Sequence, residues 1–279
     1  MLGRAPKALG YPVASFMGML SYYLAPSRRA AVKANLRMVL EPDASKSIVD
    51  SKAREVFRNI GRNYFDMVRL PHTKPHELAK DVEIRWDYLD EAVASGKGVI
   101  VASAHIGSFD LVIQIAMAHG IHFTLVTEPL RPEKLFKFVA DLRSSQGHRA
   151  VSSESGGLRD VVKTLRDGGI VAITCDRTFG GIGEKTLFMG RETLLPIGAA
   201  ELAARTGSAI VPAYNFRTNA HGKFAAYFEQ PIYFAAGASS ESIEAAHKHL
   251  ASRMEDWIRR RPEQWVVTSK VWPEEHPTK

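Results

Sequence analysis

The chain has 279 residues, of which 45% are apolar and 24% charged, and this composition is ordinary for a globular protein of one large domain, with or without an appendage. The single cysteine, Cys175, excludes an internal disulfide framework and a cysteine-based metal cluster, and favours a protein that is cytosolic or faces the cytosol. The formal net charge of +7 indicates an anionic partner.

Residues 1–40 form a basic and apolar segment, which we expect to associate with a membrane ahead of a main domain at 41–279. Its basic residues all precede the first acid, Glu41: Arg4, Lys7, Arg28, Arg29, Lys33 and Arg37. Residues 8–27 are uncharged, but glycines, a proline and serines interrupt them too often for a membrane span, which needs about 20 strongly apolar residues. A tyrosine pair and basic flanks suit insertion into the interface of an anionic bilayer. The alternative is a helix that packs on the domain's own core.

The main domain is expected to begin with a helix and a buried strand. Apolar residues recur at helical spacing over residues 45–68, and Pro71 ends the run. The sequence KGVIVAS at 97–103 is a compact β-branched run typical of a buried strand. It leads directly into HIGSFD at 105–110 and a helix that Gly120 closes.

Strands and helices then continue to alternate. Strands are expected at 121–129, around Ala150, and at 168–176, 208–217 and 223–234, and helices at 132–147, 157–167, 195–207 and 241–260. This pattern predicts an α/β fold with a central, mostly parallel sheet flanked by helices. In such sheets ligands bind at the carboxyl ends of the strands, and HIGSFD occupies such a position.

The segment HIGSFD contains a candidate catalytic pair, His105 and Asp110. Gly107 permits a tight turn, and Ser108 can cap the next helix, which places Asp110 in its first turn. An Asp near His105 would fix the imidazole tautomer and stabilise the imidazolium when the ring takes a proton. On spacing alone, Asp110 could equally complement a helix N-terminus while His105 is an ordinary loop residue.

Five blocks of the chain, taken in order, resemble the lysophospholipid acyltransferase superfamily, whose signature is His, four residues, then Asp or Glu. The similarity is to its branch of bacterial lipid A late acyltransferases and phosphatidylinositol mannoside acyltransferases. Besides HIGSFD, the similar segments are AVKANLRMVLEPD, FRNIGRNYFDMVRL, VTEPLRPEKLFKFVADLRSSQG, the long block from GGIVAITCDR to IVPAY, and RRRPEQWVV. Three departures concern the acceptor more than the reaction: Asp176-Arg177 replaces Asp-Gln, Phe-Met-Gly replaces Phe-Phe-Gly, and HIGSFD differs from the lipid A pattern.

The resemblance implies transfer of a fatty acyl group from acyl carrier protein or coenzyme A thioester to a hydroxyl of a membrane lipid or glycolipid. His105 would be the general base and Asp110 would orient it, with oxyanion donors near Gly107 or on an arginine. Candidate substrate-binding residues are Glu128, Arg143, Asp176 and Arg177, although either arginine could form a structural ion pair with a nearby acid. The resemblance further implies attachment to the cytoplasmic face of the bacterial inner membrane, with no cofactor.

Other functions are weighed against this one. A serine hydrolase is disfavoured because no G-x-S-x-G motif occurs. A non-catalytic lipid-binding protein would explain the N-terminal segment but would leave HIGSFD without a role, and a transferase of another acyl or aminoacyl group stays open. No histidine spacing suggests a metal, and no sequence pattern suggests nucleic-acid binding. Cys175 lies in an apolar strand and is expected to be inert.

Overall fold

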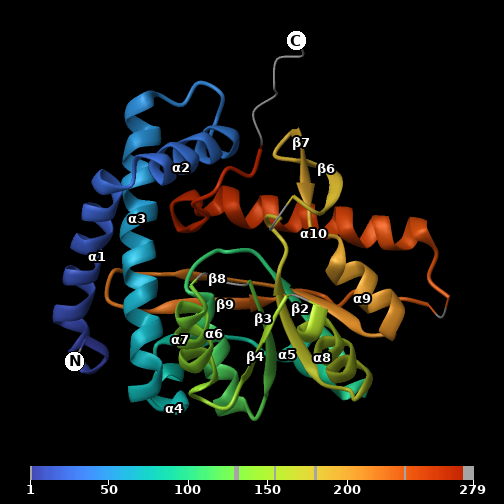
Figure 1. Cartoon of the computed structure of the whole chain (residues 1–279). Helices are drawn as coiled ribbons and strands as arrows, with labels where there is room; N and C mark the ends of the chain where they lie inside the picture. The colour runs from blue at the N-terminus through green and yellow to red at the C-terminus, as the bar shows by residue number, and fades with distance from the viewer. Residues whose placement is uncertain (1, 129–131, 154, 179–180, 236, 273–279) are drawn as a thin grey trace.

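The computed structural model describes residues 2–128, 132–153, 155–178, 181–235 and 237–272. Its centre is a seven-stranded sheet of order β1-β9-β8-β2-β5-β3-β4 (Figure 1). The strands are β1 (Val82–Ile84), β2 (Val99–Ser103), β3 (Phe123–Thr127), β4 (Arg149–Ser152), β5 (Ile170–Thr174), β8 (Ala209–Arg217) and β9 (Phe224–Phe228). Every adjacent pair is parallel except β8 and β9. The predicted α/β fold with a mostly parallel, helix-flanked sheet is confirmed.

Helices cover both faces of the sheet, and the alternation of side chains along β2 shows why. Ile100 and Ala102 pack with α8 (Ser155–Arg166), α9 (Gly198–Thr206) and α10 (Ser240–Arg260). Val99 and Val101 face the opposite side, which α5 (Asp87–Ala94), α6 (Phe109–Ile115) and the 3-10 turn η3 (Ala116–His119) cover. Because the strand is buried on both faces, its sequence is continuously apolar.

The amino-terminal helices form a separate group along one end of the sheet, where α1 (Lys7–Leu24) lies beside α3 (Lys46–Arg69), while α2 (Pro26–Val39) packs on α3 near its start (Figure 1). The close contact between α1 and α3 depends on glycine. A Cβ on Gly18 would lie 2.1 Å from the Phe57 carbonyl oxygen, and one on Gly61 would lie 2.1 Å from that of Ala14. Gly18, which interrupts the apolar segment in the sequence, therefore permits tight helix packing.

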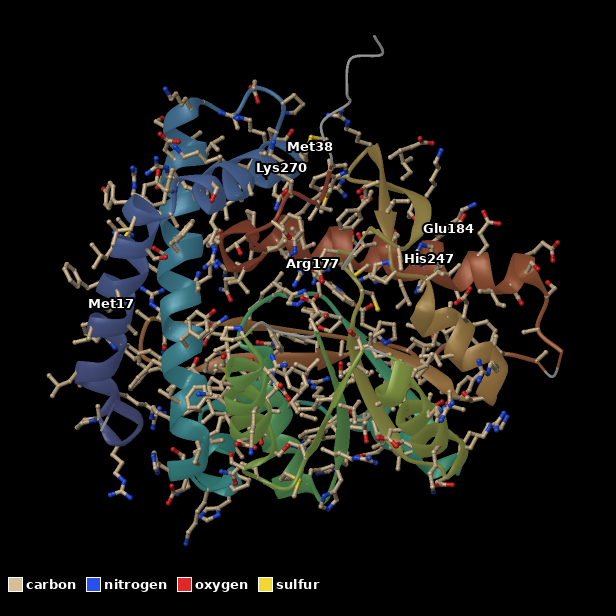
Figure 2. All side chains as sticks on the ribbon, viewed as in Figure 1. Met17, Met38, Arg177, Glu184, His247 and Lys270 are labelled. Carbon is tan, nitrogen blue, oxygen red and sulfur yellow. The ribbon has the colours of Figure 1, made fainter. Side chains whose placement is uncertain are left out.

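The helix α1 has one buried and one exposed face. One face is buried against α3 through Tyr11, Ala14 and Tyr22. The other exposes a row of large apolar side chains to solvent, with Met17 pointing outward in Figure 2. The exposed row consists of Leu9, Val13, Phe16, Met17, Leu20, Tyr23 and Leu24. Within the described part of the chain, no helix has both the length and the hydropathy that crossing a bilayer requires.

A β-hairpin, β6 (Glu184–Phe188) and β7 (Arg191–Leu195), packs beside α10 and was absent from the sequence-based expectation. Its two turn residues, Met189 and Gly190, have φ of 53° and 80°, as a type I′ turn requires. The remaining elements are α7 (Glu133–Ser144), α4 (Pro75–Ala79) and the 3-10 turns η1 (Leu2–Arg4), η2 (Leu70–His72) and η4 (Pro262–Gln264).

The buried imidazole of His148 gives the fold a testable pH dependence. Its Nδ1 accepts the Phe123 N–H at 3.0 Å, and its Nε2 lies 2.9 Å from the Ile113 carbonyl oxygen, which is the pattern of a neutral ring. Burial lowers the pKa of His148 from 6.5 to about 4. Its stabilisation is therefore complete above pH 6.5 and is lost as the pH falls toward 4. We expect the melting temperature of His148→Gln to decline less over this interval than that of the wild type, and parallel curves would contradict this assignment.

Candidate active site

The carboxyl ends of β2 and β5 bring His105 and Asp176 together. The two strands are adjacent, and their register pairs Ser103 with Thr174, so the residues two positions further along face each other. The Nδ1 atom of His105 lies 2.7 Å from Oδ1 of Asp176. The backbone N–H of His105 donates to Oδ2 of the same carboxylate at 3.0 Å. One carboxylate thus holds both the ring and the backbone of His105.

Asp176 is held in a single orientation and is completely buried, whereas the side chain of His105 is 18% exposed. The Trp265 indole N–H donates to Oδ2 of Asp176 at 2.7 Å. Burial acts to raise the pKa of Asp176, but the His105 ring, the Trp265 N–H and the His105 backbone N–H outweigh it, and the net shift is downward. An ionised Asp176 accepts the Nδ1 proton and leaves Nε2 as the basic nitrogen. Nε2 lies 3.4 Å from the Thr174 hydroxyl.

The carboxylate that contacts the imidazole is therefore Asp176, whereas the sequence assigned this contact to Asp110. Asp110 lies in the first turn of α6 and faces Arg143 of α7. Nε and one terminal nitrogen of Arg143 donate to the two Asp110 oxygens at 2.6 and 3.2 Å. The other terminal nitrogen donates to the Thr127 hydroxyl at 3.0 Å. Asp110 thus fixes Arg143, which joins α6 and α7 to the end of β3.

The remaining predicted pair, Glu128 and Arg177, lines the same cavity as His105. These residues follow β3 and β5, and a terminal nitrogen of Arg177 donates to Glu128 at 2.7 Å. Both side chains are partly exposed. All six predicted site residues therefore gather at one edge of the sheet. The Arg177–Glu128 ion pair is one that the sequence allowed, whereas the carboxylates that contact His105 and Arg143 differ from those expected.

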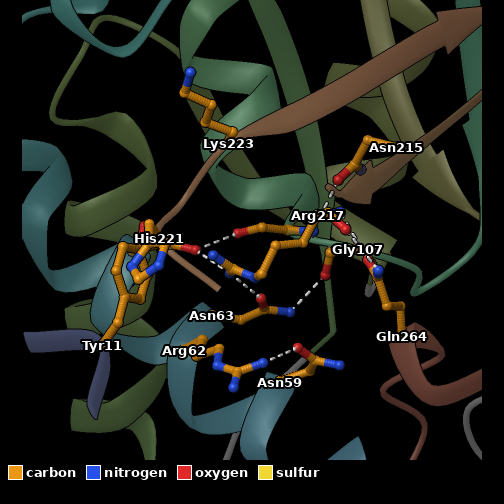
Figure 3. Close-up of polar contacts among 12 residues, drawn as sticks. Tyr11, Asn59, Arg62, Asn63, Gly107, Asn215, Arg217, His221, Lys223 and Gln264 are labelled. Carbon is orange, nitrogen blue, oxygen red and sulfur yellow. Dashed lines mark hydrogen bonds and ion pairs between the residues drawn. The ribbon is translucent and has the colours of Figure 1, made fainter. Parts of the chain in front are cut away.

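A buried polar network holds the turn that follows His105 (Figure 3). The Gly107 N–H donates to the Gln264 carbonyl, and its own carbonyl accepts from the Asn63 amide at 2.5 Å. The Ser108 N–H donates to Oδ1 of Asn215 at 2.8 Å. Gly107 has φ of 67°, and a Cβ there would lie 2.2 Å from the Asn215 side chain, so only glycine fits. Since the Gly107 N–H is already engaged by Gln264, it is not among the groups near Gly107 that are free to serve as oxyanion donors.

A buried ion pair between Asp66 and Arg217 belongs to the same network and stabilises the turn. One Asp66 oxygen accepts the Ser108 hydroxyl at 3.0 Å and Arg217 at 2.6 Å, and the other accepts the Tyr11 hydroxyl at 2.6 Å. Arg217 also donates to the Asn63 side chain at 3.0 Å. The sequence pattern did not indicate this cluster as part of the site, because its members come from α1, α3, the HIGSFD turn and β8.

A cavity of about 520 Å³ is lined by His105 and by residues of β2, β3, β5, β8 and β9. Polar side chains from the strand ends surround it near the imidazole: Ser103, Thr127, Thr174 and Asn215. Two residues earlier on each strand the lining is apolar: Val101, Leu125, Ala172 and Ala213. Farther along the cavity lie Phe123, Phe228 and Trp86. The cavity can therefore hold a long apolar group with its polar end at His105.

Among the described residues, neither a reactive thiol nor a metal-binding cluster accompanies His105 at this edge. Burial raises the pKa of the Cys175 thiol to about 12, which keeps it protonated. Among the residues described, no cluster of three or more His, Cys, Asp or Glu side chains could hold a metal ion.

Comparison with known proteins now supplies a family for this arrangement. The family model for bacterial lipid A biosynthesis acyltransferases matches residues 1–273. The chain belongs to that family. It is an acyltransferase. Its membership of the family supports a lipid or glycolipid as the molecule that receives the acyl group.

Individual relatives of this acyltransferase are also known. It is 30% identical to a phosphatidylinositol mannoside acyltransferase of Mycobacterium tuberculosis over 220 residues, 76% of this chain and 67% of the relative. It is 27% identical over 243 residues to the protein of the same name from Mycolicibacterium smegmatis, covering 85% and 76% of the two chains. Among solved structures, the 1-acyl-sn-glycerophosphate acyltransferase PlsC from Thermotoga maritima aligns with 90% of this chain and 98% of its own, with a TM-score of 0.42 and 16% identity.

Proposed function

We propose that this acyltransferase moves a fatty acyl group from a thioester to a sugar hydroxyl of a phosphoglycolipid, with His105 as general base. Nε2 of His105 takes the proton of the acceptor hydroxyl, whose oxygen attacks the thioester carbonyl carbon. The carbon–sulfur bond then breaks, and the departing thiolate takes the proton from the imidazolium. Asp176 stays ionised throughout and stabilises the imidazolium between these steps.

The observation that carries this proposal is the His105–Asp176 pair at the polar end of the apolar cavity. The 2.7 Å contact to the buried carboxylate supports the tautomer that a base requires. The lining changes from hydroxyl and amide groups to aliphatic ones within two residues along each strand. A fatty acyl chain placed in the apolar part would leave its thioester carbonyl beside Nε2.

The residue Trp86 is proposed to limit the length of that chain. It lies 5.5 Å from Phe228, centroid to centroid, and stacks on His119 at 4.4 Å. Phe228 pairs with Ala213, on the side of the cavity away from His105. We expect Trp86→Ala to favour longer donors, by about fourfold in kcat/KM for each additional methylene that the new space buries. A series of acyl-CoA donors measures this, with Trp86→Phe as the smaller truncation, and an unchanged optimum in both variants would contradict it.

The relatives guide the choice of acceptor. The curated relatives are phosphatidylinositol mannoside acyltransferases, and this supports a mannosylated or similar phosphoglycolipid as acceptor here. Acyl carrier protein or coenzyme A would present the thioester, and no further cofactor is required, because the imidazole both accepts and returns the proton. We propose that Glu128, Arg143 and Arg177, which line the cavity, bind the substrates or hold the shape of the cavity around them.

The exposed row of α1 supports attachment to a membrane surface, which we place on the cytoplasmic face of the inner membrane. Phe16 and Leu24 are 66% and 72% exposed, and full burial of such side chains contributes about 1.5–3 kcal/mol each. We therefore expect Phe16→Asp with Leu24→Asp to weaken binding to anionic liposomes by at least about tenfold. Leu187→Asp, at a 66% exposed site on β6, is the matched control. Equal liposome binding by the wild type, the double α1 variant and Leu187→Asp would refute attachment through α1.

The experiment that tests the proposed function is product analysis with purified protein. Acyl-CoA or acyl carrier protein thioester is supplied with phosphatidylinositol mannoside, and thiol release and the lipid product are followed together. The expected result is acceptor-dependent thiol release and a new ester on a sugar hydroxyl. Thiol release of the same rate without lipid, accompanied by free fatty acid, would instead identify a thioester hydrolase.

A further inference from the structure

The arginine Arg28 differs from the other arginines of the catalytic cavity. It lies in the first turn of α2, lines the cavity together with Val266 and Thr268, and is exposed. Within the ranges that the structure describes, no carboxylate contacts its guanidinium. Its five N–H donors are therefore available to a bound molecule.

The other two cavity arginines are already neutralised. Arg143 uses Nε and both terminal nitrogens on Asp110 and Thr127, and burial opposes its charge while the Asp110 carboxylate restores it, so its pKa is raised. Arg177 is paired with Glu128. An anionic substrate group that enters the cavity thus meets one uncompensated guanidinium among the described residues, and it is Arg28.

The position of Arg28 relative to α1 indicates which anion it meets. The exposed apolar row of α1 ends at Tyr23 and Leu24, 61% and 72% exposed, and α2 begins at Pro26. If the row rests in the acyl region of a bilayer, a cation one turn beyond its end lies at the depth of the phosphate groups. Guanidinium binds phosphate through two parallel N–H···O bonds, which also fixes the orientation of the bound group.

We propose that Arg28 binds the phosphodiester of the acceptor lipid while a hydroxyl of its headgroup reaches Nε2 of His105. This assignment rests on the proposed function and deepens it, because it names the residue that holds the phosphate of the phosphoglycolipid acceptor. The phosphate anchors the lipid at the entrance of the cavity, and the sugar extends inward to the imidazole.

The test combines kinetics with a binding measurement that needs no turnover. Arg28→Gln is expected to raise the acceptor KM by about 10- to 100-fold, as the loss of a charge-assisted contact predicts, and Arg28→Lys to raise it less. The KM for acyl-CoA should stay unchanged. Arg37→Gln is the matched control, since Arg37 is exposed on the same helix but does not line the cavity. A glycosylated diacylglycerol without phosphate should be acylated equally by Arg28→Gln and wild type.

Titration of a soluble short-chain phosphatidylinositol by calorimetry separates this proposal from the catalytic one. We expect Arg28→Gln to bind it at least about tenfold more weakly than Arg37→Gln. Binding that depends on Arg28 in a protein without acyl transfer would refute the function and retain this site. An unchanged acceptor KM in an active Arg28→Gln enzyme would overturn the site alone. An increase in the KM for acyl-CoA, absent with a phosphate-free acyl thioester, would assign Arg28 to the donor and overturn the proposal.

Discussion

Replacing Asp176 with Asn is expected to lower kcat for acyl transfer by about 10²- to 10⁴-fold. Two N–H groups, from Trp265 and from the His105 backbone, donate to Oδ2 of Asp176, so an oxygen must stay on that side of the side chain. The new amide NH₂ would then face Nδ1 of His105 and donate to it. The ring would carry its proton on Nε2, which can no longer accept the proton of the acceptor hydroxyl.

The substrate constants separate this effect from a loss of binding. Asp176 is fully buried and is absent from the cavity lining, so the KM values for donor and acceptor should change little. Asp110→Asn is the comparison variant, because Asp110 contacts Arg143 and leaves the imidazole with its own carboxylate. We expect Asp110→Asn to retain more kcat than Asp176→Asn. The reverse order would return the orienting role to Asp110.

Replacing Asp66 with Ala is expected to destabilise the protein by about 3–5 kcal/mol, because it leaves a buried arginine without its carboxylate. The side chains of Asp66 and Arg217 are 0% and 4% exposed. The Arg217 guanidinium also lies over the rings of Phe224 and Tyr11, at 4.5 and 5.2 Å from their centroids. It therefore cannot move to solvent without disrupting the contact between α1, α3 and β8.

Chemical denaturation measures this loss, and the exposed pair Lys163–Asp167 provides the control. Its side chains are 74% and 59% exposed, so Asp167→Ala should change stability by at most about 1 kcal/mol. We expect the melting temperature of Asp66→Ala to fall by about 5–9 °C. A loss as small as that of Asp167→Ala would show that the buried pair contributes little.

The sequence predicted the main elements because their signals are local. The run VIVAS of β2 is buried on both faces, and α3 follows an apolar pattern of helical period that ends before Pro71. The hairpin of β6 and β7 gave no such signal. Its turn uses Met189 at positive φ, where sequence rules expect Asn, Asp or Gly, and the contact from the Met189 N–H to Glu255 of α10 at 2.7 Å helps to hold it.

The carboxylate partners could not be read from the sequence, because they depend on strand order. Asp110 is five residues from His105 in the chain, whereas Asp176 is 71 residues away and becomes its neighbour only because β2 pairs with β5. The same limit applies to Trp265, Asn215 and Gln264, which reach the turn from β8 and the carboxyl-terminal segment. Local spacing predicted the edge of the sheet where the site lies, but not its pairs.

The most direct test of the central claim is the rate of lipid-dependent thiol release from acyl-CoA in His105→Ala and His105→Gln compared with the wild type. Loss of the base should lower kcat by about 10²- to 10⁴-fold in both variants, with folding and liposome binding unchanged. Transfer at the wild-type rate in either variant would contradict the account, since its acceptor hydroxyl would then lose its proton to some group other than His105.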